Sequence, residues 1–314
     1  MVICVGEILV DLIAEKRENG VFYGRHAGGA PFNVACGIAK LGGNAGFYGC
    51  VGDDPFGKFL SDFAAEQTLG YNKIKKIIDR NTTLALVELE EGERKFGFYR
   101  KHTADACLQT SDIPELVQTA DILHLGSLPM SEPYGRQFYD ELIARARQAH
   151  KKISFDVNYR SGLFPDENAA RSVYADYAAA ADIVKLSDEE LSFLTGETDL
   201  RRGIEKIADD TKVVFVTFGG KGSACFSRGQ LIRMPAMPVR VMDTTGAGDA
   251  FFAGVLTVLD QFPDDLERAL FTGSACGALT TTQKGAIDAF PSRAELNRFL
   301  DSSGFANGTF FKER

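Results

Sequence analysis

Short apolar runs alternate with amphipathic stretches along most of this 314-residue chain. Apolar strands separated by helices are typical of a mostly parallel sheet with helices on both faces. The runs expected to form strands are Val2–Val5, Ile122–Leu125, Ile153–Phe155, Ile183–Val184 and Val213–Phe218, with helices such as Tyr134–His150 and Asp188–Leu194 between them. The predicted fold is therefore α/β and doubly wound. Ligands of such sheets bind beyond the carboxyl ends of the strands, so the Gly, Asp and Ser residues that close these runs are candidate site residues.

Two stretches interrupt this alternation. Leu12–Arg25 and Thr82–Arg100 have extended patterns without helical periodicity, and the second resembles a hairpin that turns near Glu91 and Gly92. A lid over the site is one interpretation, and a hairpin that only faces solvent is the other. No repeat, Pro-rich linker or low-complexity tract divides the chain, so we expect a single domain over residues 1–314, with a lid formed by about residues 12–33 and 80–104.

Composition excludes several classes of protein. The chain has 43 acidic and 35 basic residues, a net charge of −8, so no basic field favours nucleic acid or an anionic membrane surface. Its six cysteines are scattered and form no C-x-x-C pair, which favours buried thiols over disulfides or a zinc site. The first residues lack the pattern of a signal peptide, and no apolar stretch reaches the roughly 20 residues that span a bilayer. We expect a cytoplasmic protein.

The most informative stretch is a glycine-containing segment ahead of an apolar helix. Residues Ala250–Leu259 are apolar on nearly every face, and Gly246, Ala247 and Gly248 precede them with Asp249 in the expected first turn. Free N–H groups and the helix dipole at such a start bind anions, and a carboxylate beside them could accept a hydroxyl proton. This combination is typical of phosphoryl transfer to an alcohol. The alternative is an acid that only caps a buried helix.

A second glycine cluster also precedes an expected helix, from about Pro31 to Leu41. Gly28 and Gly29 would let a ligand approach the backbone, and Asn33 offers both a donor and an acceptor. A tight turn followed by a helix with an early proline is an equally good interpretation of this cluster alone. The chain has no G-x-x-x-x-G-K-[ST] motif, and no G-x-G-x-x-G follows its first strand.

At these two clusters the chain resembles the PfkB (ribokinase-like) family of carbohydrate kinases. Gly28 to Asn33, followed by Gly42 and Gly52, is similar to the family's N-terminal signature, and Asp243 to Asp249 with Ala253-Gly254 is similar to its C-terminal signature. Both occur in order and at the usual distance, and the resemblance covers essentially the whole chain. It implies a ribokinase-like fold with a small β-sheet lid.

The resemblance also implies a role for individual residues. Asp249 matches the catalytic base, and Gly246, Ala247 and Gly248 match the anion hole. The sugar-contacting residues that it implies are Asp11, Gly28, Gly29 and Asn33. The turn under the nucleotide matches Thr217, Gly219 and Gly222. A monovalent-cation site matches Asp243 and Thr245, with backbone carbonyls near Gly285.

One segment departs from the family pattern. Many members carry Asn-x-x-Glu between the magnesium and phosphate contacts, whereas this chain has Ser187 and Glu190 after Lys185. Fructokinase-like members commonly have a serine there, so the resemblance still implies nucleotide contacts for all three residues. The alternative for Glu190 is an ordinary exposed helix acid. Arg100, in the lid hairpin, and Arg160 match substrate contacts, although Arg100 could also be a solvated charge at a strand end.

Within the family, the stretches Phe96–Leu108 and Asp156–Arg160 look most like the fructokinase pattern. The resemblance thus implies transfer of the γ-phosphoryl group of ATP, with Mg²⁺ and in some members K⁺, to the primary hydroxyl of a ketose such as D-fructose. The same features fit 2-keto-3-deoxygluconate kinase, whose acid substrate suits an arginine. A non-catalytic sugar-binding protein stays open as a remote alternative. The expected partners are the sugar and ATP, and some relatives dimerise through paired lids.

Overall fold

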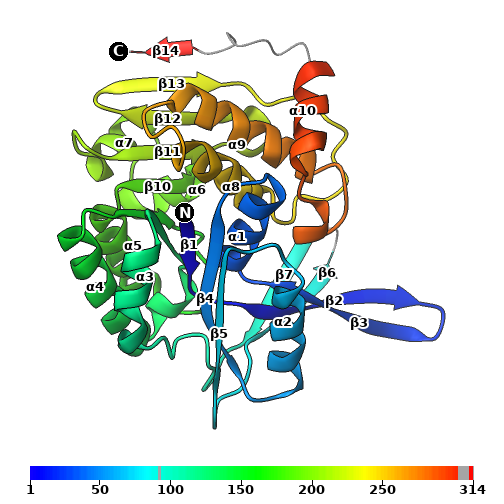
Figure 1. Ribbon diagram of the computed structural model, residues 1–314. Helices are drawn as coiled ribbons and strands as arrows, with labels where there is room; N and C mark the ends of the chain where they lie inside the picture. Colours follow the sequence, from blue (N-terminus) through cyan, green and yellow to red (C-terminus); the bar gives the residue numbers. More distant parts are fainter. Residues whose placement is uncertain (91–92, 303–310, 314) are drawn as a thin grey trace.

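The computed structural model describes residues 1–90, 93–302 and 311–313. A ten-stranded sheet crosses the molecule, in the order β14-β13-β12-β11-β10-β9-β8-β1-β4-β5 (Figure 1). The pairs from β11 to β5 are all parallel, and β12, β13 and β14 continue the sheet, each antiparallel to its neighbour. The parallel strands are β1 (Val2–Val5), β4 (Ala45–Gly52), β5 (Tyr71–Ile77), β8 (Ile122–Leu125), β9 (Lys152–Asp156), β10 (Ile183–Ser187) and β11 (Val213–Thr217). The antiparallel ones are β12 (Ser223–Ser227), β13 (Gln230–Met234) and β14 (Phe311–Glu313).

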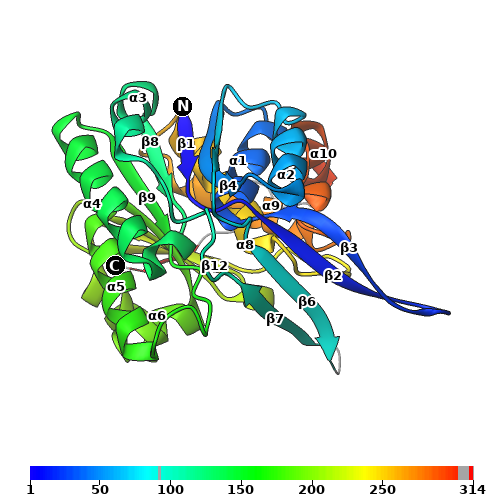
Figure 2. The same ribbon diagram turned by 90° about the horizontal axis from the view of Figure 1, so that it is seen from below.

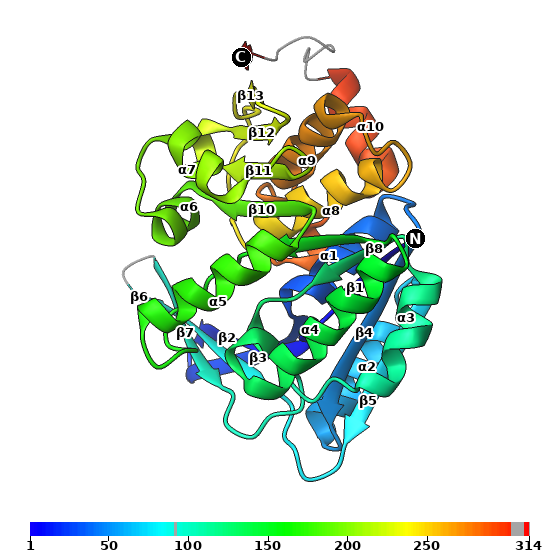
Figure 3. The same cartoon turned by 90° about the vertical axis from the view of Figure 1, so that its left-hand side faces the viewer.

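Helices cover both faces of this sheet, as predicted. Strand β1 shows how the two cores form: Val2 and Cys4 pack into one cluster, and Ile3 and Val5 pack into the other. The first cluster lies under α1 (Ala30–Lys40), α2 (Pro55–Ala65), α8 (Ala247–Leu259), α9 (Leu266–Thr280) and α10 (Arg293–Ser302). The second lies under α3 (Ile113–Thr119), α4 (Pro133–Gln148), α5 (Glu167–Ala180), α6 (Asp188–Thr195) and α7 (Leu200–Ile207), part of which faces the viewer in Figure 3.

A second sheet of four strands projects from the body of the molecule (Figure 2). Its order is β3-β2-β6-β7, with β2 (Leu9–Arg17), β3 (Gly20–Gly28), β6 (Leu84–Glu90) and β7 (Glu93–Tyr99). The two stretches expected to leave the core form this sheet, but its boundaries differ from the prediction, because residues 30–33 already belong to helix α1. The expected turn at Glu91 and Gly92 lies outside the described residues. We call the four strands the lid sheet.

Several boundaries and elements also differ from the sequence prediction. Strand β10 continues through Lys185 to Ser187, where the apolar run had suggested an end at Val184. Strands β4, β5 and β12 to β14 were not predicted. Helix α8 begins at Ala247, which places Asp249 in its first turn, as predicted. All six cysteines are free, but Cys107 is partly exposed, so the expectation of six buried thiols is wrong at that position.

The strand order reverses at β1, whose neighbours are β4 on one side and β8 on the other. Ligands of open α/β sheets bind at such a reversal, beyond the carboxyl ends of the strands. Lid strand β2 begins at Leu9, shortly after β1 ends at Val5 at this edge. Strand β6 begins beside β2, because Val10 pairs with Leu84 and the N–H of Val10 donates to the carbonyl of Thr83. The fold therefore places the lid over the edge where a site is expected.

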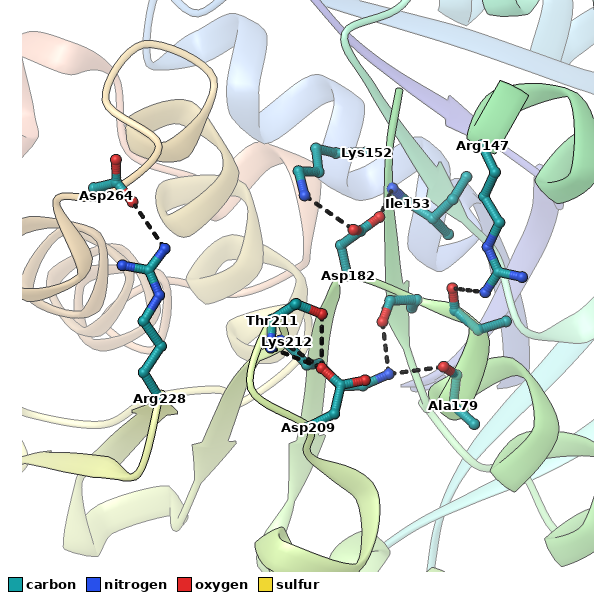
Figure 4. Close-up of polar contacts among 12 residues, drawn as sticks. Arg147, Lys152, Ile153, Ala179, Asp182, Asp209, Thr211, Lys212, Arg228 and Asp264 are labelled. Carbon is teal, nitrogen blue, oxygen red and sulfur yellow. Dashed lines mark hydrogen bonds and ion pairs between the residues drawn. The ribbon is translucent and has the colours of Figure 1, made fainter. Parts of the chain in front are cut away.

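At the amino-terminal edge of the strands, lysine side chains form contacts within the protein (Figure 4). Lys152, at the start of β9, pairs with Asp182 at 3.0 Å. Lys212, just before β11, is buried and donates to the carbonyls of Ala178, Ala179 and Ala181 at 2.7, 2.9 and 2.7 Å. Its ammonium thereby caps the C-terminus of α5, where the helix dipole favours a cation. The Lys212 contacts thus connect the end of α5 to the start of β11. No helix among the described residues is both long and apolar enough to cross a membrane.

Candidate active site

Helix α8 begins with an uncapped turn at the carboxyl edge of the sheet. Its N-cap, Gly246, has a left-handed backbone with φ of 72°, and a Cβ there would lie 2.9 Å from the side chains of both Ala286 and Phe290. No side chain among the described residues caps this start, so the first-turn N–H groups of Gly248 and Asp249 can meet a ligand. Together with the helix dipole they form an anion-binding position.

Asp249 lies in that first turn and is held by a second helix. Nδ2 of Asn33, on α1, donates to Oδ2 of Asp249 at 2.8 Å. The two helices approach closely because Gly37 of α1 faces Ala253 of α8, where a Cβ would lie only 2.7 Å from the Ala253 Cβ. Burial raises the pKa of Asp249 above its ordinary value, although the Asn33 hydrogen bond and nearby cations partly oppose this. Its carboxylate is thus fixed in direction and more basic than that of an ordinary aspartate.

Next to Asp249, polar groups from α1 and the lid sheet converge. Oδ1 of Asn33 is buried and has no hydrogen-bond partner in the described structure, so it is an acceptor that a ligand donor could satisfy. The Asp11 carboxylate, on β2, lies directly over Gly28, where any Cβ would overlap it. Gly29 has φ of 108° and passes against the carbonyl of Glu7. These groups can hydrogen-bond the hydroxyls of a small polyol.

A buried ion pair lies beneath the start of α8. Nζ of Lys185, on β10, contacts the two carboxylate oxygens of Asp156, at the end of β9, at 3.1 and 2.9 Å. A Cβ added at Gly248 would lie 3.1 Å from this ammonium. Burial would lower the pKa of Lys185, but the charges of Asp156 and Glu190 outweigh that effect and raise it. A protonated lysine therefore lies next to the anion-binding turn.

Ser187 and Glu190 form a capping box at the start of α6. The Glu190 N–H donates to Oγ of Ser187 at 3.1 Å, and Oε2 of Glu190 accepts from the Ser187 N–H at 2.7 Å. Oε1 of Glu190 accepts from the N–H of Tyr159 at 2.8 Å, which ties this helix to the loop that carries Arg160. The alternative of an ordinary exposed acid is therefore wrong for Glu190, which is only partly exposed. Arg160 is close enough to Asp249 to lower its pKa.

The residues expected around the nucleotide lie at the neighbouring strand end. Thr217 ends β11, and the turn after it contains Gly219 and Gly222, with φ of 53° and 111°. A Cβ added at Gly219 or at Gly220 would meet no atom within 4 Å, so this turn borders open space. It offers room for a flat ring or a ribose, and its glycines let a ligand lie against the backbone.

Asp243, Thr245 and Gly285 are brought together by direct hydrogen bonds. Asp243 Oδ1 accepts from the N–H and hydroxyl of Thr245 at 3.0 and 2.6 Å, and Oδ2 accepts from the N–H of Gly285 at 3.0 Å. The described residues contain no group of three or more His, Cys, Asp or Glu side chains that could hold a metal ion. The monovalent-cation site expected at Asp243 and Thr245 stays a prediction.

Arg100 is not a solvated strand-end charge, because its side chain is only 6% exposed. It follows β7 directly and pairs with Asp105 at 2.6 Å. The residues predicted for base, anion hole and sugar contact thus converge at one edge of the sheet. Arg100 lies at the base of the lid sheet, already bound to another side chain.

The family model for pfkB family carbohydrate kinases matches residues 1–293 of the chain. The chain belongs to the pfkB family of carbohydrate kinases. It is 38% identical over 304 residues to a fructokinase of Klebsiella pneumoniae, covering 94% of this chain and 98% of that one. This confirms the kinase class and the family predicted from the two glycine clusters.

Two solved structures are closely similar to this kinase. Fructokinase from Xylella fastidiosa with bound ATP superposes with a TM-score of 0.87 at 32% identity, covering 96% of this chain and 98% of that one. A double mutant of fructokinase from Vibrio cholerae O395, with bound fructose, ADP and a potassium ion, gives a TM-score of 0.87 at 35% identity, covering 95% and 97%. The ribokinase-like fold with its lid sheet is confirmed, and the protein is a fructokinase-like carbohydrate kinase.

Sequence reasoning missed three acids near the site of this kinase. Asp156 directly follows the predicted strand Ile153–Phe155, at the end where ligands of such sheets bind, but no role was assigned to it. Glu7 follows the first strand by one glycine and is fully buried. Asp105 lies in the stretch Phe96–Leu108 that resembles the fructokinase pattern, but no role was assigned to it, because only the fold shows its ion pair with Arg100. Such pairings depend on tertiary structure and leave no spacing pattern in the sequence.

Glu7 should make the stability of the kinase depend on pH. Neither carboxylate oxygen has a hydrogen-bond partner of good geometry in the described structure, and burial raises the pKa of Glu7 to about 8. The pKa of Glu7 in the folded kinase exceeds its unfolded value of 4.5. The stability that Glu7 contributes in its protonated form is therefore fully present below pH 4.5 and is lost as the pH rises through about 8. Between about pH 6 and pH 8.5, Glu7 should cost roughly 2 to 3 kcal/mol of unfolding free energy.

The Glu7→Gln variant tests this expectation, because its side chain cannot ionise. Denaturant unfolding at both pH values should show a smaller loss of stability at high pH in the variant than in the parent kinase. Glu189→Gln, at an exposed position, is the matched control and should keep the parent's pH dependence. Parallel pH profiles for the parent and Glu7→Gln would show that Glu7 is already ionised in the folded kinase.

Proposed function

We propose that this kinase transfers the γ-phosphoryl group of ATP to the primary hydroxyl of D-fructose, giving fructose 6-phosphate. The observation that carries the proposal is the pairing of Asp249 with an uncapped helix start, with Asn33 fixing the carboxylate. A base and an anion-binding turn side by side are what phosphoryl transfer to an alcohol requires. The fructose bound to the Vibrio cholerae relative supports the choice of sugar.

In the proposed mechanism the sugar lies between the lid sheet and α1. Asp11 and the unsatisfied Oδ1 of Asn33 accept hydrogen bonds from its hydroxyls and turn the primary hydroxyl toward Asp249. Asp249 takes the hydroxyl proton as the oxygen attacks the γ-phosphorus, and the bond from this phosphorus to the bridging oxygen of ADP breaks, so that ADP leaves. The N–H groups at the start of α8 stabilise the charge on the transferring group, and the lid excludes water that would otherwise accept it.

The nucleotide is proposed to lie along the ends of β10 and β11. Thr217, Gly219 and Gly222 would border its base and ribose, and Lys185 and the Ser187–Glu190 turn would lie near its phosphates. The ATP bound to the Xylella fastidiosa relative supports the choice of nucleotide. Use of ATP also agrees with the cytoplasmic location expected from the sequence.

Two cations are part of the proposal. Mg²⁺ usually binds through substrate phosphates, waters and one or two carboxylates, so the lack of an acid cluster among the described residues fits a metal carried by the nucleotide. It would offset phosphate charge when bound. K⁺ would lie near Asp243 and Gly285. The potassium ion bound to the Vibrio cholerae relative supports the choice of cation. Carbonyl oxygens are suitable ligands for K⁺.

A homodimer through paired lids is the proposed assembly. It is supported by Val21, Phe22 and Tyr23 on strand β3, which are 53%, 46% and 43% exposed. Adjacent apolar side chains on an outer strand are typical of an interaction surface.

A kinetic screen of sugars tests the proposed function. ADP release is measured with MgATP and, in separate reactions, fructose, 2-keto-3-deoxygluconate, ribose and nucleosides. We expect the highest kcat/KM for fructose, at least about ten times that for the keto-acid, because specificity depends on the match of hydroxyl partners. Preference for the keto-acid would replace fructose with that alternative. Turnover of none of these compounds would favour the non-catalytic alternative.

A further inference from the structure

Arg100 is committed to an ion pair inside the protein. Its Nε and Nη2 atoms lie 2.8 and 2.6 Å from Oδ2 of Asp105, and Nη1 donates to the hydroxyl of Ser131. The side chains of Arg100 and Asp105 are 6% and 1% exposed. The charge of the guanidinium is therefore balanced within the protein and hidden from solvent.

The Asp105 carboxylate is fixed from its other side by two threonines. Oδ1 accepts from the hydroxyls of Thr83 and Thr103 at 2.6 and 2.7 Å. Burial alone would raise the pKa of Asp105, but the charge of Arg100 and these hydrogen bonds outweigh it and lower the pKa. Glu7 also lies near Arg100, but burial raises its pKa to about 8, so it is mostly neutral at pH 7. Asp105 is therefore the anion that balances Arg100.

The pair lies at the end of the lid sheet that borders the site. Tyr99 pairs with Leu84, Leu84 with Val10, and the neighbouring Leu9 with Gly28, so Arg100 falls at the same end of the sheet as Gly28. Arg100 therefore lies at the end of the lid sheet that carries Gly28 and the carboxylate of Asp11 beside it.

The remaining charges of the site are mostly negative. Asp11 and Asp249 are acids, Arg160 is a base, and Lys185 is balanced by Asp156. Arg100 is balanced in the same way by Asp105. A neutral ketose meets hydroxyl partners there, whereas the carboxylate of a sugar acid would meet the acids Asp11 and Asp249 and no uncompensated cation at Arg100.

We propose that Asp105 selects a neutral ketose over a 2-keto-3-deoxy sugar acid by holding Arg100 in this buried ion pair. The proposal rests on the function proposed above and names the substrate class that the same site accepts. Asp105 acts through Arg100, so it is a positioning residue that determines specificity.

Asp105→Asn is the direct test. Asparagine has nearly the same shape and can still accept from Thr83 and Thr103, but it leaves the guanidinium charge of Arg100 unbalanced. We expect the ratio of kcat/KM for 2-keto-3-deoxygluconate to that for fructose to rise by about 10-fold or more, mainly through a lower KM for the acid. Added salt should weaken the gain, because it screens the attraction between carboxylate and guanidinium.

Two further variants show whether the effect passes through Arg100. In Asp105→Asn combined with Arg100→Gln, the gain for the acid should disappear, because no unbalanced cation remains. Asp112→Asn is the matched control: Asp112 is another buried acid, paired with Lys73 and Lys75 at 2.9 and 2.6 Å, and lies outside the site. The Asp112→Asn variant should leave the ratio of kcat/KM for the two substrates unchanged even if it lowers stability.

Thr83→Val provides a second test if Asp105→Asn does not fold. It removes one hydrogen bond from Asp105 and changes no charge. The ratio of kcat/KM for 2-keto-3-deoxygluconate to that for fructose should therefore rise by about 2- to 5-fold. An unchanged ratio in the folded variants, with normal fructose turnover in the parent kinase, would overturn this inference alone. Absence of fructose turnover in the parent kinase would overturn the proposed function instead.

Discussion

Replacing Asp249 with asparagine is expected to lower kcat by about 10²- to 10⁴-fold, the range that a positioned general base contributes. The new side chain can still accept the hydrogen bond from Nδ2 of Asn33, which is 2.8 Å long in the parent kinase, so the geometry of the site should survive. It cannot take up the hydroxyl proton. ADP release at saturating MgATP and fructose measures the loss.

Sugar affinity separates this effect from a general disruption of the site. Because Asp11, Asn33 and the lid are unchanged in Asp249→Asn, fructose binding measured by calorimetry should stay within a few-fold of that of the parent kinase. Asp265→Asn is the matched control. Asp265 is the N-cap of α9, where asparagine caps as well as aspartate, so this variant should keep both activity and stability. A kcat for Asp249→Asn within about 10-fold of the parent value would contradict the role of base.

Replacing Lys185 with methionine is expected to cost about 3 to 5 kcal/mol of unfolding free energy, because it leaves the Asp156 carboxylate buried without its partner. The side chains of Lys185 and Asp156 are only 8% and 3% exposed, so water cannot replace the lost contact. The variant should also lose most of its activity, since the ammonium lies next to Gly248 in the anion-binding turn. Denaturant unfolding measures the stability, and ADP release measures the activity.

A second substitution distinguishes a lost ion pair from lost packing. In Lys185→Met combined with Asp156→Leu, no unpaired charge remains, so much of the stability should return while activity stays low. Lys212→Met is a control at the opposite edge of the sheet: it should also lower stability, because the ammonium caps α5, but it should leave the kinetic constants of the folded enzyme unchanged. If Lys185→Met lowers the stability by less than about 1 kcal/mol, the pair is not a buried structural contact.

The sequence predicted the parts of this kinase that depend on local pattern. The parallel strands β1 and β8 match their apolar runs residue for residue, because a strand buried on both faces leaves a continuous apolar segment. The helix start at Gly246 was recognisable because small residues, an acid and an apolar helix are adjacent in the chain. Resemblance to the family then supplied the expected roles of distant residues such as Asp11.

Other features could not be read from local pattern. Strand β4 contains three glycines, which weaken any strand signal, and β5 is partly exposed and rich in lysine, as edge strands often are. Arg100 was expected at the sugar, but its ion pair with Asp105 forms only because the chain turns back after β7. Glu190 was expected to contact the nucleotide, with an exposed helix acid as the alternative, and only the fold shows that its carboxylate accepts from the N–H of Tyr159.

The most direct test of the central claim is the reaction with fructose from the sugar screen, with the phosphorylated product identified in addition to the ADP released. The claim is that Asp249 and the start of α8 direct a phosphoryl group to a sugar hydroxyl and exclude water. Phosphorus NMR of the reaction with MgATP should therefore show fructose 6-phosphate and ADP formed in equal amounts. Release of inorganic phosphate in place of a sugar phosphate, or no turnover of fructose, would contradict the claim.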